Sequence, residues 1–296
     1  MTDQLRVGLV GAGPWATAVH APMIAAHPET DLVGVWARRP AAAAVLAGAH
    51  GAEPFDSVPS LISAVDVVAF AVPPAVQVPF AIEAARAGRH LILEKPVAAT
   101  LDQAYRLTDA VSTAGVANIV MLVMRFAPET TEWLEVLASL GGWRAGSARW
   151  LSGALLGGPY SASPWRYEDG ALADVGPHTV DLIDAALGEV TDVLAASYAE
   201  PDVWHLILGH RGGATSTVSL SMRLPLTPTI TSVEVYEEYG HSDLPLRSTP
   251  AEDSYTALLD DLVGMVRGGT TRHPCDVHRG LHLQRVLHAA RELSRR

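Results

Sequence analysis

The basic residues of this 296-residue chain include a single lysine, Lys95, in the sequence Glu94-Lys95-Pro96; all the others are arginine. Arginine stays protonated, whereas the pKa of a lysine changes readily on burial and its ammonium group can transfer a proton. Lys95 directly follows the apolar run Leu91-Ile92-Leu93. It is therefore a candidate for proton chemistry, the alternative being that one lysine survived by chance.

A glycine motif lies near the start of the chain, in Gly11-Ala12-Gly13-Pro14-Trp15-Ala16. It fits the G-x-G-x-x-G/A pattern, in which the first glycine permits a tight turn, the second lets the backbone approach a pyrophosphate, and the small third residue allows close packing. The amides of the following helix would face the phosphates. We therefore expect Gly11, Gly13, Pro14, Trp15 and Ala16 to bind a dinucleotide; the alternative is a purely structural turn.

The cofactor preference is predicted from the end of the second strand, which reads Trp36-Ala37-Arg38-Arg39-Pro40. A site that prefers NAD usually has an acidic residue here to bind the ribose, and an acid would repel the 2′-phosphate of NADP. Arg38, with Arg39 beside it, could pair with that phosphate instead. NADP is thus favoured over NAD, unless both arginines are only solvated loop residues.

A second candidate site contains Asp174 and His178, followed by Asp181. In a helix this spacing puts the three side chains on one face, although Pro177 requires a first-turn position or a kink. A carboxylate beside an imidazole can orient the ring and form an acid–base pair. A surface ion pair or two ligands of a metal site are the alternatives. No compact ligand cluster accompanies the pair, so no metal is predicted.

The elements that must position these residues alternate between strand and helix in the first part of the chain. Repeated βα units of this kind predict a parallel sheet with helices on both faces, a doubly wound Rossmann domain. The expected strands are 5–10, 32–36, 66–72, 90–93 and 116–123, and the expected helices are 14–26, 76–87 and 101–113. The glycine motif and Lys95 both follow strands of this sheet.

The pattern changes after a helix expected at 128–140. Strand-like runs at 143–155, 190–198, 203–208, 214–222 and 230–239 suggest a mostly antiparallel, open sheet in a C-terminal α+β domain. Two helices, about 253–267 and 277–293, end the chain. We predict a dinucleotide-binding domain at 1–123 and a second domain at 124–275, with the helix of about 276–296 packing back on the first.

Composition excludes several classes of protein. The net charge of −11 and the absence of a basic run argue against nucleic-acid binding. Cys275 is the only cysteine, which fits a reducing cytoplasm, and no apolar stretch reaches the ~20 residues of a membrane helix. The N-terminal residues lack the order of a signal peptide. A cytoplasmic, soluble enzyme with no membrane contact is expected.

Further motifs accompany those above, namely Val72-Pro73-Pro74, Arg125-Phe126, Trp165-Arg166 and Gly170-Ala171-Leu172-Ala173-Asp174. In this order, over essentially the whole chain, they resemble the Gfo/Idh/MocA oxidoreductase family, which includes glucose–fructose oxidoreductase and inositol dehydrogenase. Two departures concern the substrate more than the cofactor. Gln77 stands where the family often has histidine, and Tyr167-Glu168-Asp169 partly replaces glycines that commonly precede the Asp-x-x-x-His segment.

The resemblance implies roles for individual residues. Lys95 would lie near the nicotinamide and the reacting oxygen, with Asp174 and His178 facing it from the second domain, and either Lys95 or His178 could move the proton. Pro96 would shape the turn, with a cis bond as one option. The implied cofactor pocket adds Val72, Pro73 and Glu94, and the implied substrate pocket contains Arg125, Trp165, Arg166 and His178. A homodimer or homotetramer through the C-terminal sheet is also implied.

The expected function is an NAD(P)-dependent dehydrogenase or reductase that acts on CH–OH groups of a sugar, polyol or related hydroxy or keto compound. Two alternatives share the fold: a nucleotide-binding sensor without catalysis, and a relative that cleaves glycosides through transient oxidation.

Other prominent side chains are assigned no chemistry. His20, His27 and His50 are expected to be ordinary helix or surface residues, and Trp133, Trp143, Trp150 and Trp204 to lie in the core or an interface.

Overall fold

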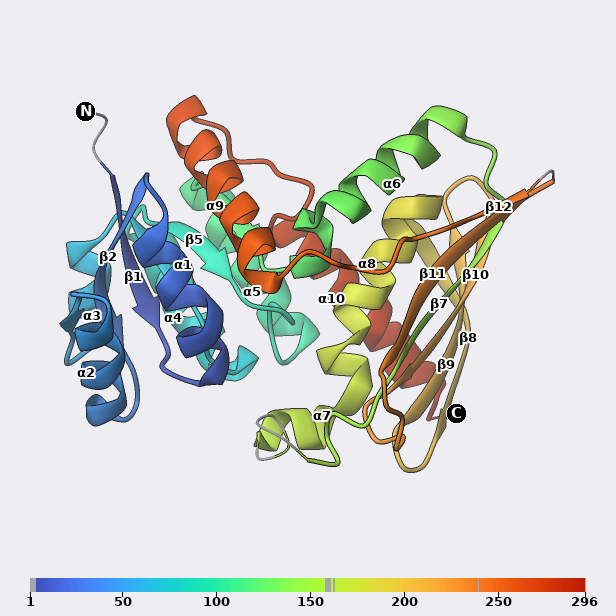
Figure 1. Cartoon of the computed structure of the whole chain (residues 1–296), viewed down its shortest axis with the longest axis horizontal. Coiled ribbons are helices and arrows are strands. Elements are labelled where there is room, and N and C mark those ends of the chain that lie inside the picture. The colour runs from blue at the N-terminus through green and yellow to red at the C-terminus, as the bar shows by residue number, and fades with distance from the viewer. Residues whose placement is uncertain (1–3, 158–160, 162, 239, 296) are drawn as a thin grey trace. The chain divides into compact units, whose positions relative to one another are not determined.

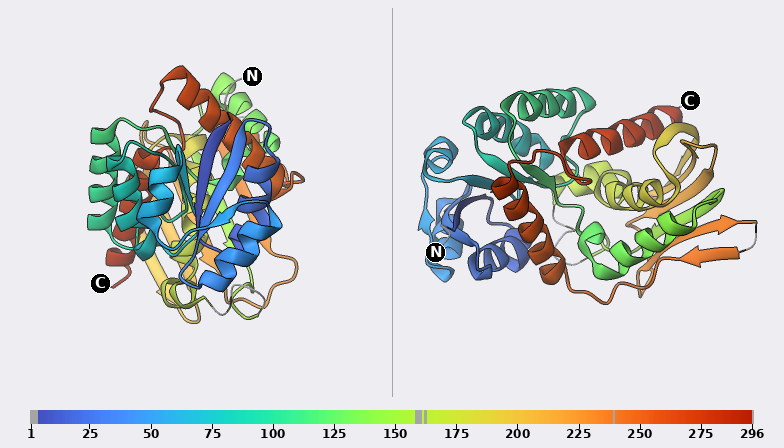
Figure 2. Two further views of the ribbon diagram at one scale, coloured as in Figure 1. Left: turned by 90° about the vertical axis from the view of Figure 1, so that its left-hand side faces the viewer. Right: turned by 90° about the horizontal axis from the view of Figure 1, so that it is seen from above.

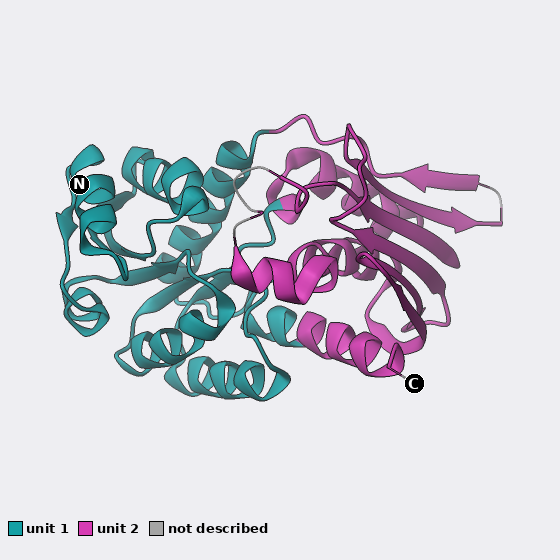
Figure 3. Cartoon of the chain, turned by 90° about the horizontal axis from the view of Figure 1, so that it is seen from below, with its two compact units in different colours: residues 1–123, 250–281 teal, residues 124–249, 282–296 magenta. Residues whose placement is uncertain are grey.

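The computed structural model describes residues 4–157, 161, 163–238 and 240–295 (Figure 1). They form two compact units (Figure 3). Unit 1 contains Met1–Val123 and Pro250–Leu281, and unit 2 contains Met124–Thr249 and His282–Arg296. Each unit is described by itself below.

Unit 1 is built on a six-stranded sheet in which every pair of neighbours is parallel. The strand order is β3-β2-β1-β4-β5-β6, the order of a dinucleotide-binding Rossmann sheet. Its strands are β1 (Leu5–Val10), β2 (Thr30–Trp36), β3 (Glu53–Pro54), β4 (Val67–Phe70), β5 (His90–Leu93) and β6 (Asn118–Val120). β4 is buried along its whole length, because helices cover both faces of a parallel sheet. The predicted fold class is confirmed for this part of the chain.

The helices of unit 1 lie on both faces of that sheet, as the left view of Figure 2 shows. They are η1 (Ala16–His20, a π-helical turn), α1 (Ala21–Ala26), α2 (Pro40–Ala49), α3 (Val58–Ala64), α4 (Pro74–Arg86), α5 (Leu101–Ala114), α9 (Ala251–Gly268) and the first residues of α10 (Val277–Leu293). The sequence did not predict α2, β3 or α3. The alanine-rich α2 has little contrast between apolar and polar faces, and the other two are short.

The last part of the chain is grouped differently from the expectation. The predicted second domain, 124–275, included α9, yet the structure assigns Pro250–Leu281 to unit 1 and His282–Arg296 to unit 2. The reason is side-chain contact over long sequence separation. His27 bonds Asp260 of α9 at 3.1 Å, and α9 also contacts η1 and β6.

Unit 2 contains a mixed six-stranded sheet in the order β12-β11-β7-β10-β9-β8. Only the β7–β10 pair is parallel, so the prediction of a mostly antiparallel sheet is confirmed. Its strands are β7 (Ala145–Leu151), β8 (Val190–Ala199), β9 (Val203–His210), β10 (Thr215–Ser221), β11 (Ile230–Glu237) and β12 (Gly240–Asp243). Along β9, buried Trp204, Leu206 and Leu208 alternate with more exposed residues, so one face of the sheet forms the core.

The helical segments described in unit 2 are η2 (Val123–Phe126, a 3-10 turn that starts at the boundary), α6 (Pro128–Leu140), α7 (Pro164–Asp174), α8 (Gly176–Leu187) and the remainder of α10 from His282. α8 contacts β7, β10 and β11 and covers the buried face of the sheet. Pro177 occupies the first turn of α8, where a missing amide proton costs nothing, as expected. No helix among the described residues combines the length and apolar character needed to cross a membrane.

Candidate active site

The glycine turn follows β1. Its first residue lies so close to the backbone at the end of β4, the neighbouring strand in the sheet, that only glycine fits there. Gly11 has φ = +129°, and a Cβ atom there would lie 2.4 Å from the carbonyl oxygen of Ala71. The Gly11 amide donates to the carbonyl of Trp36 over 2.7 Å. Only glycine adopts this backbone without strain and allows this approach. Gly11 therefore brings the ends of β1, β2 and β4 together.

Gly13 differs from Gly11, because a Cβ atom there would meet no protein atom within 4 Å. The chain turns into helix at Pro14, and Ala16, at the third position of the motif, is fully buried. Trp15 is half-buried. An open backbone at Gly13 before a helix N-terminus is the geometry that accepts a pyrophosphate. The residues present therefore fit a dinucleotide.

Two other expected cofactor residues lie at the same edge of the sheet. Val72 follows β4, and its Cγ1 atom is 3.2 Å from the position of a Gly11 Cβ. Pro73 caps the N-terminus of α4. Arg38 and Arg39 follow β2 and are exposed, and Arg39 caps α2. The structure thus brings Val72 to the glycine turn and leaves the two arginines at the surface beyond β2.

The Glu94-Lys95-Pro96 turn follows β5, and its Lys95–Pro96 bond is cis. Gln77 of α4 is fully buried and holds the backbone of this turn. Its side-chain amide donates to the Glu94 and Val97 carbonyls at 2.9 and 3.1 Å, and its oxygen accepts from the Glu94 amide at 2.8 Å. Lys95 itself is half-buried. The amino-acid sequence alone identified Gln77 only as a departure from the family pattern and assigned it no role.

The Glu94 carboxylate is held on both oxygens. Oε2 accepts from the backbone amide of Lys95 at 3.1 Å, and Oε1 lies 3.0 Å from Nε2 of His20. His20 is fully buried. The expectation that His20 is an ordinary helix or surface residue therefore missed its contact with the Glu94-Lys95 turn, which joins positions 74 residues apart in the chain.

In unit 2, α7 brings Trp165 and Arg166, at its N-terminal end, together with Asp174, at its C-terminal end. Nε of Arg166 donates to Oδ2 of Asp174 at 3.0 Å, and the Arg166 guanidinium lies over the Trp165 ring, 4.6 Å from its centre. Asp174 is 6% exposed. Gly170, at φ = +64°, interrupts the helix between Arg166 and Asp174. Arg166, assigned to the substrate pocket, is thus also an ion-pair partner of the candidate catalytic carboxylate.

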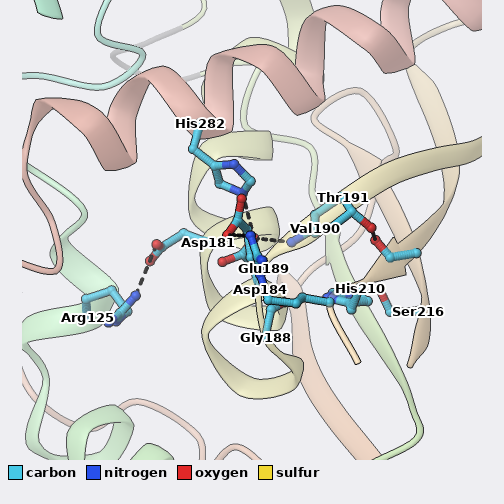
Figure 4. A network of polar contacts seen from close by, with 12 residues as sticks. Arg125, Asp181, Asp184, Gly188, Glu189, Val190, Thr191, His210, Ser216 and His282 are labelled. Carbon is cyan, nitrogen blue, oxygen red and sulfur yellow. Dashed lines mark hydrogen bonds and ion pairs between the residues drawn. The ribbon is translucent and has the colours of Figure 1, made fainter. Parts of the chain in front are cut away.

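His178 lies in the first turns of α8 and is stacked against Trp150 of β7, with ring centres 5.8 Å apart and planes 24° apart. Three residues further along α8, buried Asp181 pairs with Arg125 at 3.1 Å (Figure 4). Trp150 was expected to be a core or interface residue. The sequence around Trp150 does not predict its contact with His178, because that contact depends on the packing of α8 on the sheet.

The candidate catalytic residues come from both units: Lys95 belongs to unit 1, and Asp174 and His178 belong to unit 2. No group of three or more histidine, cysteine or acidic side chains suited to a metal occurs among the described residues.

Comparison with known proteins identifies the family. Residues 5–122 match the model of the "Oxidoreductase family, NAD-binding Rossmann fold" (GFO_IDH_MocA). Residues 5–122 thus belong to the Gfo/Idh/MocA oxidoreductase family. A relative over nearly the full length is dTDP-3,4-didehydro-2,6-dideoxy-alpha-D-glucose 3-reductase of Streptomyces antibioticus, 27% identical over 98% of both chains. D-glucoside 3-dehydrogenase of Escherichia coli K12 is 30% identical over 63% of this chain and 55% of that enzyme.

Solved structures share the fold of this chain over nearly its whole length. Levoglucosan dehydrogenase, in complex with NADH and levoglucosan, has a TM-score of 0.87 at 19% identity and covers 99% of this chain and 97% of that one. A 3-ketoreductase of Actinomadura kijaniata, in complex with TDP-benzene and NADP, has a TM-score of 0.79 at 20% identity, with 98% of each chain covered. At these identities the similarity concerns the fold alone.

Proposed function

We propose that this oxidoreductase transfers a hydride between a nicotinamide dinucleotide and a CH–OH or keto carbon of a sugar or sugar-like polyol. The observation that carries the proposal is the shared edge of the unit 1 sheet. The open backbone at Gly13, the Val72 strand end and the Glu94-Lys95 turn all follow strands there. This carboxyl edge is where open α/β sheets bind their ligands. The names of the sugar reductases and dehydrogenases similar to the chain support the substrate class.

When bound, the nicotinamide ring would accept the hydride in the oxidation direction and supply it in the reduction direction. Side chains of the protein must transfer the proton that accompanies the hydride. As an alcohol C–H bond breaks and the C=O bond forms, the hydroxyl proton must pass to a base, and in reduction the same group must return it. Lys95 is proposed for this transfer or for stabilising the alkoxide with its ammonium group. His178 is the second candidate for the proton.

The unit 2 residues have supporting parts in this proposal. Trp150 holds the plane of the His178 ring, and the Arg166 pair fixes the Asp174 carboxylate. Asp174 is proposed as the acidic group that would stabilise a cationic His178 during the reaction. Arg125 and Trp165 are proposed to line the substrate pocket. Because Arg125 is paired with Asp181, its guanidinium is held in one orientation.

The test compares Lys95→Met and Lys95→Arg with the wild-type enzyme. Turnover of a panel of free sugars, glycosides and nucleotide-linked sugars is followed by nicotinamide absorbance. Removing a positioned acid–base group costs about 10²–10⁴-fold in rate, so Lys95→Met should lose kcat by that order, and an equal loss in Lys95→Arg would assign the proton transfer to Lys95. Arginine keeps the charge but does not release a proton at neutral pH. The nucleotide Kd should change little, and full activity of Lys95→Met would contradict the proposed role.

We further propose that the enzyme prefers NADP, because Arg38 is exposed just beyond β2 and no acidic side chain ends that strand. Charged hydrogen bonds contribute about 1.5–3 kcal/mol, so Arg38→Ala should weaken NADPH binding by roughly tenfold or more and leave NADH binding unchanged. Arg86→Ala is the matched control, since it removes an exposed arginine from the C-terminal end of α4. Equal affinity of the Arg38 variant and wild type for NADPH would contradict this preference.

A homo-oligomer through the open sheet of unit 2 is also proposed. The sheet face opposite α8 exposes apolar side chains, among them Ile207 of β9 at 44% and Ile230 of β11 at 41%. A second copy of the chain would cover them, since exposed apolar areas on sheets mark interaction surfaces. Ile207→Glu should lower the molecular mass measured by light scattering. Val45→Glu, which changes an apolar side chain exposed at 75% in unit 1, is the control.

A further inference from the structure

A chain of buried hydrogen-bonding groups runs through unit 1 to the Glu94-Lys95 turn. The hydroxyl of Tyr255, in α9, lies 2.9 Å from Nδ1 of His20, and Nε2 of His20 lies 3.0 Å from Oε1 of Glu94. Tyr255 and His20 are both 0% exposed, and their rings meet edge to face with centres 4.8 Å apart. The Glu94-Lys95 turn is thus linked to α9 by two side chains, His20 and Tyr255, that lie outside the sequence motifs.

The direction of these hydrogen bonds follows from the chemistry of the groups. Burial raises the pKa of Tyr255 well above its usual value, so its hydroxyl keeps its proton. The Glu94 carboxylate can only accept, so Nε2 of His20 carries a proton, and in the neutral ring Nδ1 then accepts from the Tyr255 hydroxyl. Nε2–H donates to Oε1 of Glu94, whose other oxygen accepts from the Lys95 amide. Each ring nitrogen and each carboxylate oxygen has one defined role.

The hydrogen-bonded series Tyr255–His20–Glu94 is better suited to orienting the carboxylate than to transferring a proton. It ends at Tyr255, whose hydroxyl lies in the interior and therefore cannot exchange a proton directly with water or substrate. Its other end is the Glu94 carboxylate, the side chain of which is 13% exposed. Gln77 already holds the backbone of Glu94 from α4. What His20 adds is a fixed rotamer of the carboxylate, and hence a retained hydrogen bond to the amide of Lys95.

We infer that Tyr255 and His20 are positioning residues, which orient the Glu94 carboxylate and through it the Lys95 backbone for hydride and proton transfer. The inference rests on the proposed catalytic role of Lys95. Displacement of a reacting group by about 1 Å can cost on the order of 10²-fold in rate, so loss of this orientation should lower kcat more than it raises KM.

The chain offers a matched control. His27 follows α1, is also buried, and bonds Asp260 of α9 at 3.1 Å without a contact to Glu94. His20→Leu and His27→Leu therefore each remove a histidine that bonds α9, but only the first releases Glu94. His20→Gln tests rescue, because its amide nitrogen can replace Nε2 as the donor to Glu94.

The experiment measures kcat, KM and nucleotide Kd for wild type, His20→Leu, His20→Gln, Tyr255→Phe and His27→Leu. His20→Leu should lose kcat by roughly tenfold to 10²-fold with KM and Kd within about threefold of wild type. Tyr255→Phe, which removes one hydroxyl, should lose several-fold, and His20→Gln should recover most of the activity. Wild-type kcat in His20→Leu, or an equal loss in His27→Leu, would overturn the inference.

A second readout does not need turnover. Because Lys95 is the only lysine, reductive methylation with ¹³C-formaldehyde labels its side chain and the N-terminus alone. The Lys95 methyl signal should shift in His20→Leu and Tyr255→Phe and keep its wild-type position in His27→Leu. If the wild-type enzyme turned over none of the sugars, the proposed function would fail while this signal still tested the positioning. An unchanged Lys95 methyl signal in both His20→Leu and Tyr255→Phe would overturn the inference that these residues position the Glu94-Lys95 turn.

Discussion

Alanine substitution at the two glycines of the nucleotide motif should produce opposite effects on stability and binding. At Gly11, the added methyl group would lie 2.4 Å from the backbone oxygen of Ala71, at a φ of +129° that alanine disfavours. At Gly13, the methyl group would meet no protein atom within 4 Å, and φ lies outside the left-handed range. The same chemical change thus tests steric necessity at one position and ligand access at the other.

The magnitudes follow from these contacts. A residue in a disfavoured backbone region costs about 1–3 kcal/mol, and the overlap with a carbonyl oxygen adds to it, so Gly11→Ala should lose about 3 kcal/mol of unfolding free energy. Gly13→Ala should leave stability unchanged or raise it by about 0.4–1 kcal/mol, because alanine restricts the unfolded chain. If a pyrophosphate approaches the Gly13 backbone, the methyl group obstructs it. A loss of about 1.4 kcal/mol would raise the Kd tenfold.

The assay combines urea denaturation with titration of NADPH and NADH, followed by quenching of tryptophan fluorescence. Gly13→Ala should unfold at the wild-type urea concentration or above and bind both nucleotides at least tenfold more weakly. Gly11→Ala should unfold at lower urea. Wild-type nucleotide affinity in Gly13→Ala would refute the assignment of this turn to the pyrophosphate. A loss of stability in Gly13→Ala equal to that in Gly11→Ala would refute the steric argument.

Three further outcomes are expected from contacts and exposure in the folded chain. Asp181→Ala should lose about 3 kcal/mol in urea denaturation, since it leaves the largely buried Arg125 guanidinium without its ion-pair partner, and a loss below about 1 kcal/mol would contradict that. Hydrogen bonds to Glu129, first from the Ser248 hydroxyl, lower its pKa. The folded state thus favours the carboxylate, and the stabilisation is complete above the ordinary pKa of 4.5 and lost as the pH falls below it. Glu129→Gln should therefore be less stable than wild type at pH 7, with a difference that shrinks in acid; a constant difference in melting curves across that range would contradict this. Gly264→Ala, at an exposed site within α9 with no neighbouring atom within 4 Å, should raise stability by about 0.5–1 kcal/mol, and a lowered melting temperature would contradict it.

Elements with a strong local pattern were predicted well. The strand Leu5–Val10, the strand His90–Leu93 and the helix Pro128–Leu140 have the expected bounds. The segment 40–64 was not assigned, because an alanine-rich helix and a seven-residue helix carry little periodic signal. The residues that support the site were missed for a different reason. Gln77, His20 and Trp150 act through contacts with residues far away in the sequence.

The chemistry available to this protein was determined by the sequence itself: a lone lysine after a strand, a G-x-G turn before a helix, and an acid–imidazole pair at helical spacing. Such features depend on residue type and a few neighbouring positions, so they can be recognised without a fold. The tertiary structure alone decided which side chains hold them. Tyr255 reaches His20 across 235 positions, and His20 reaches Glu94 across 74, because packing of helices on a sheet joins segments whose separation along the chain carries no local signal.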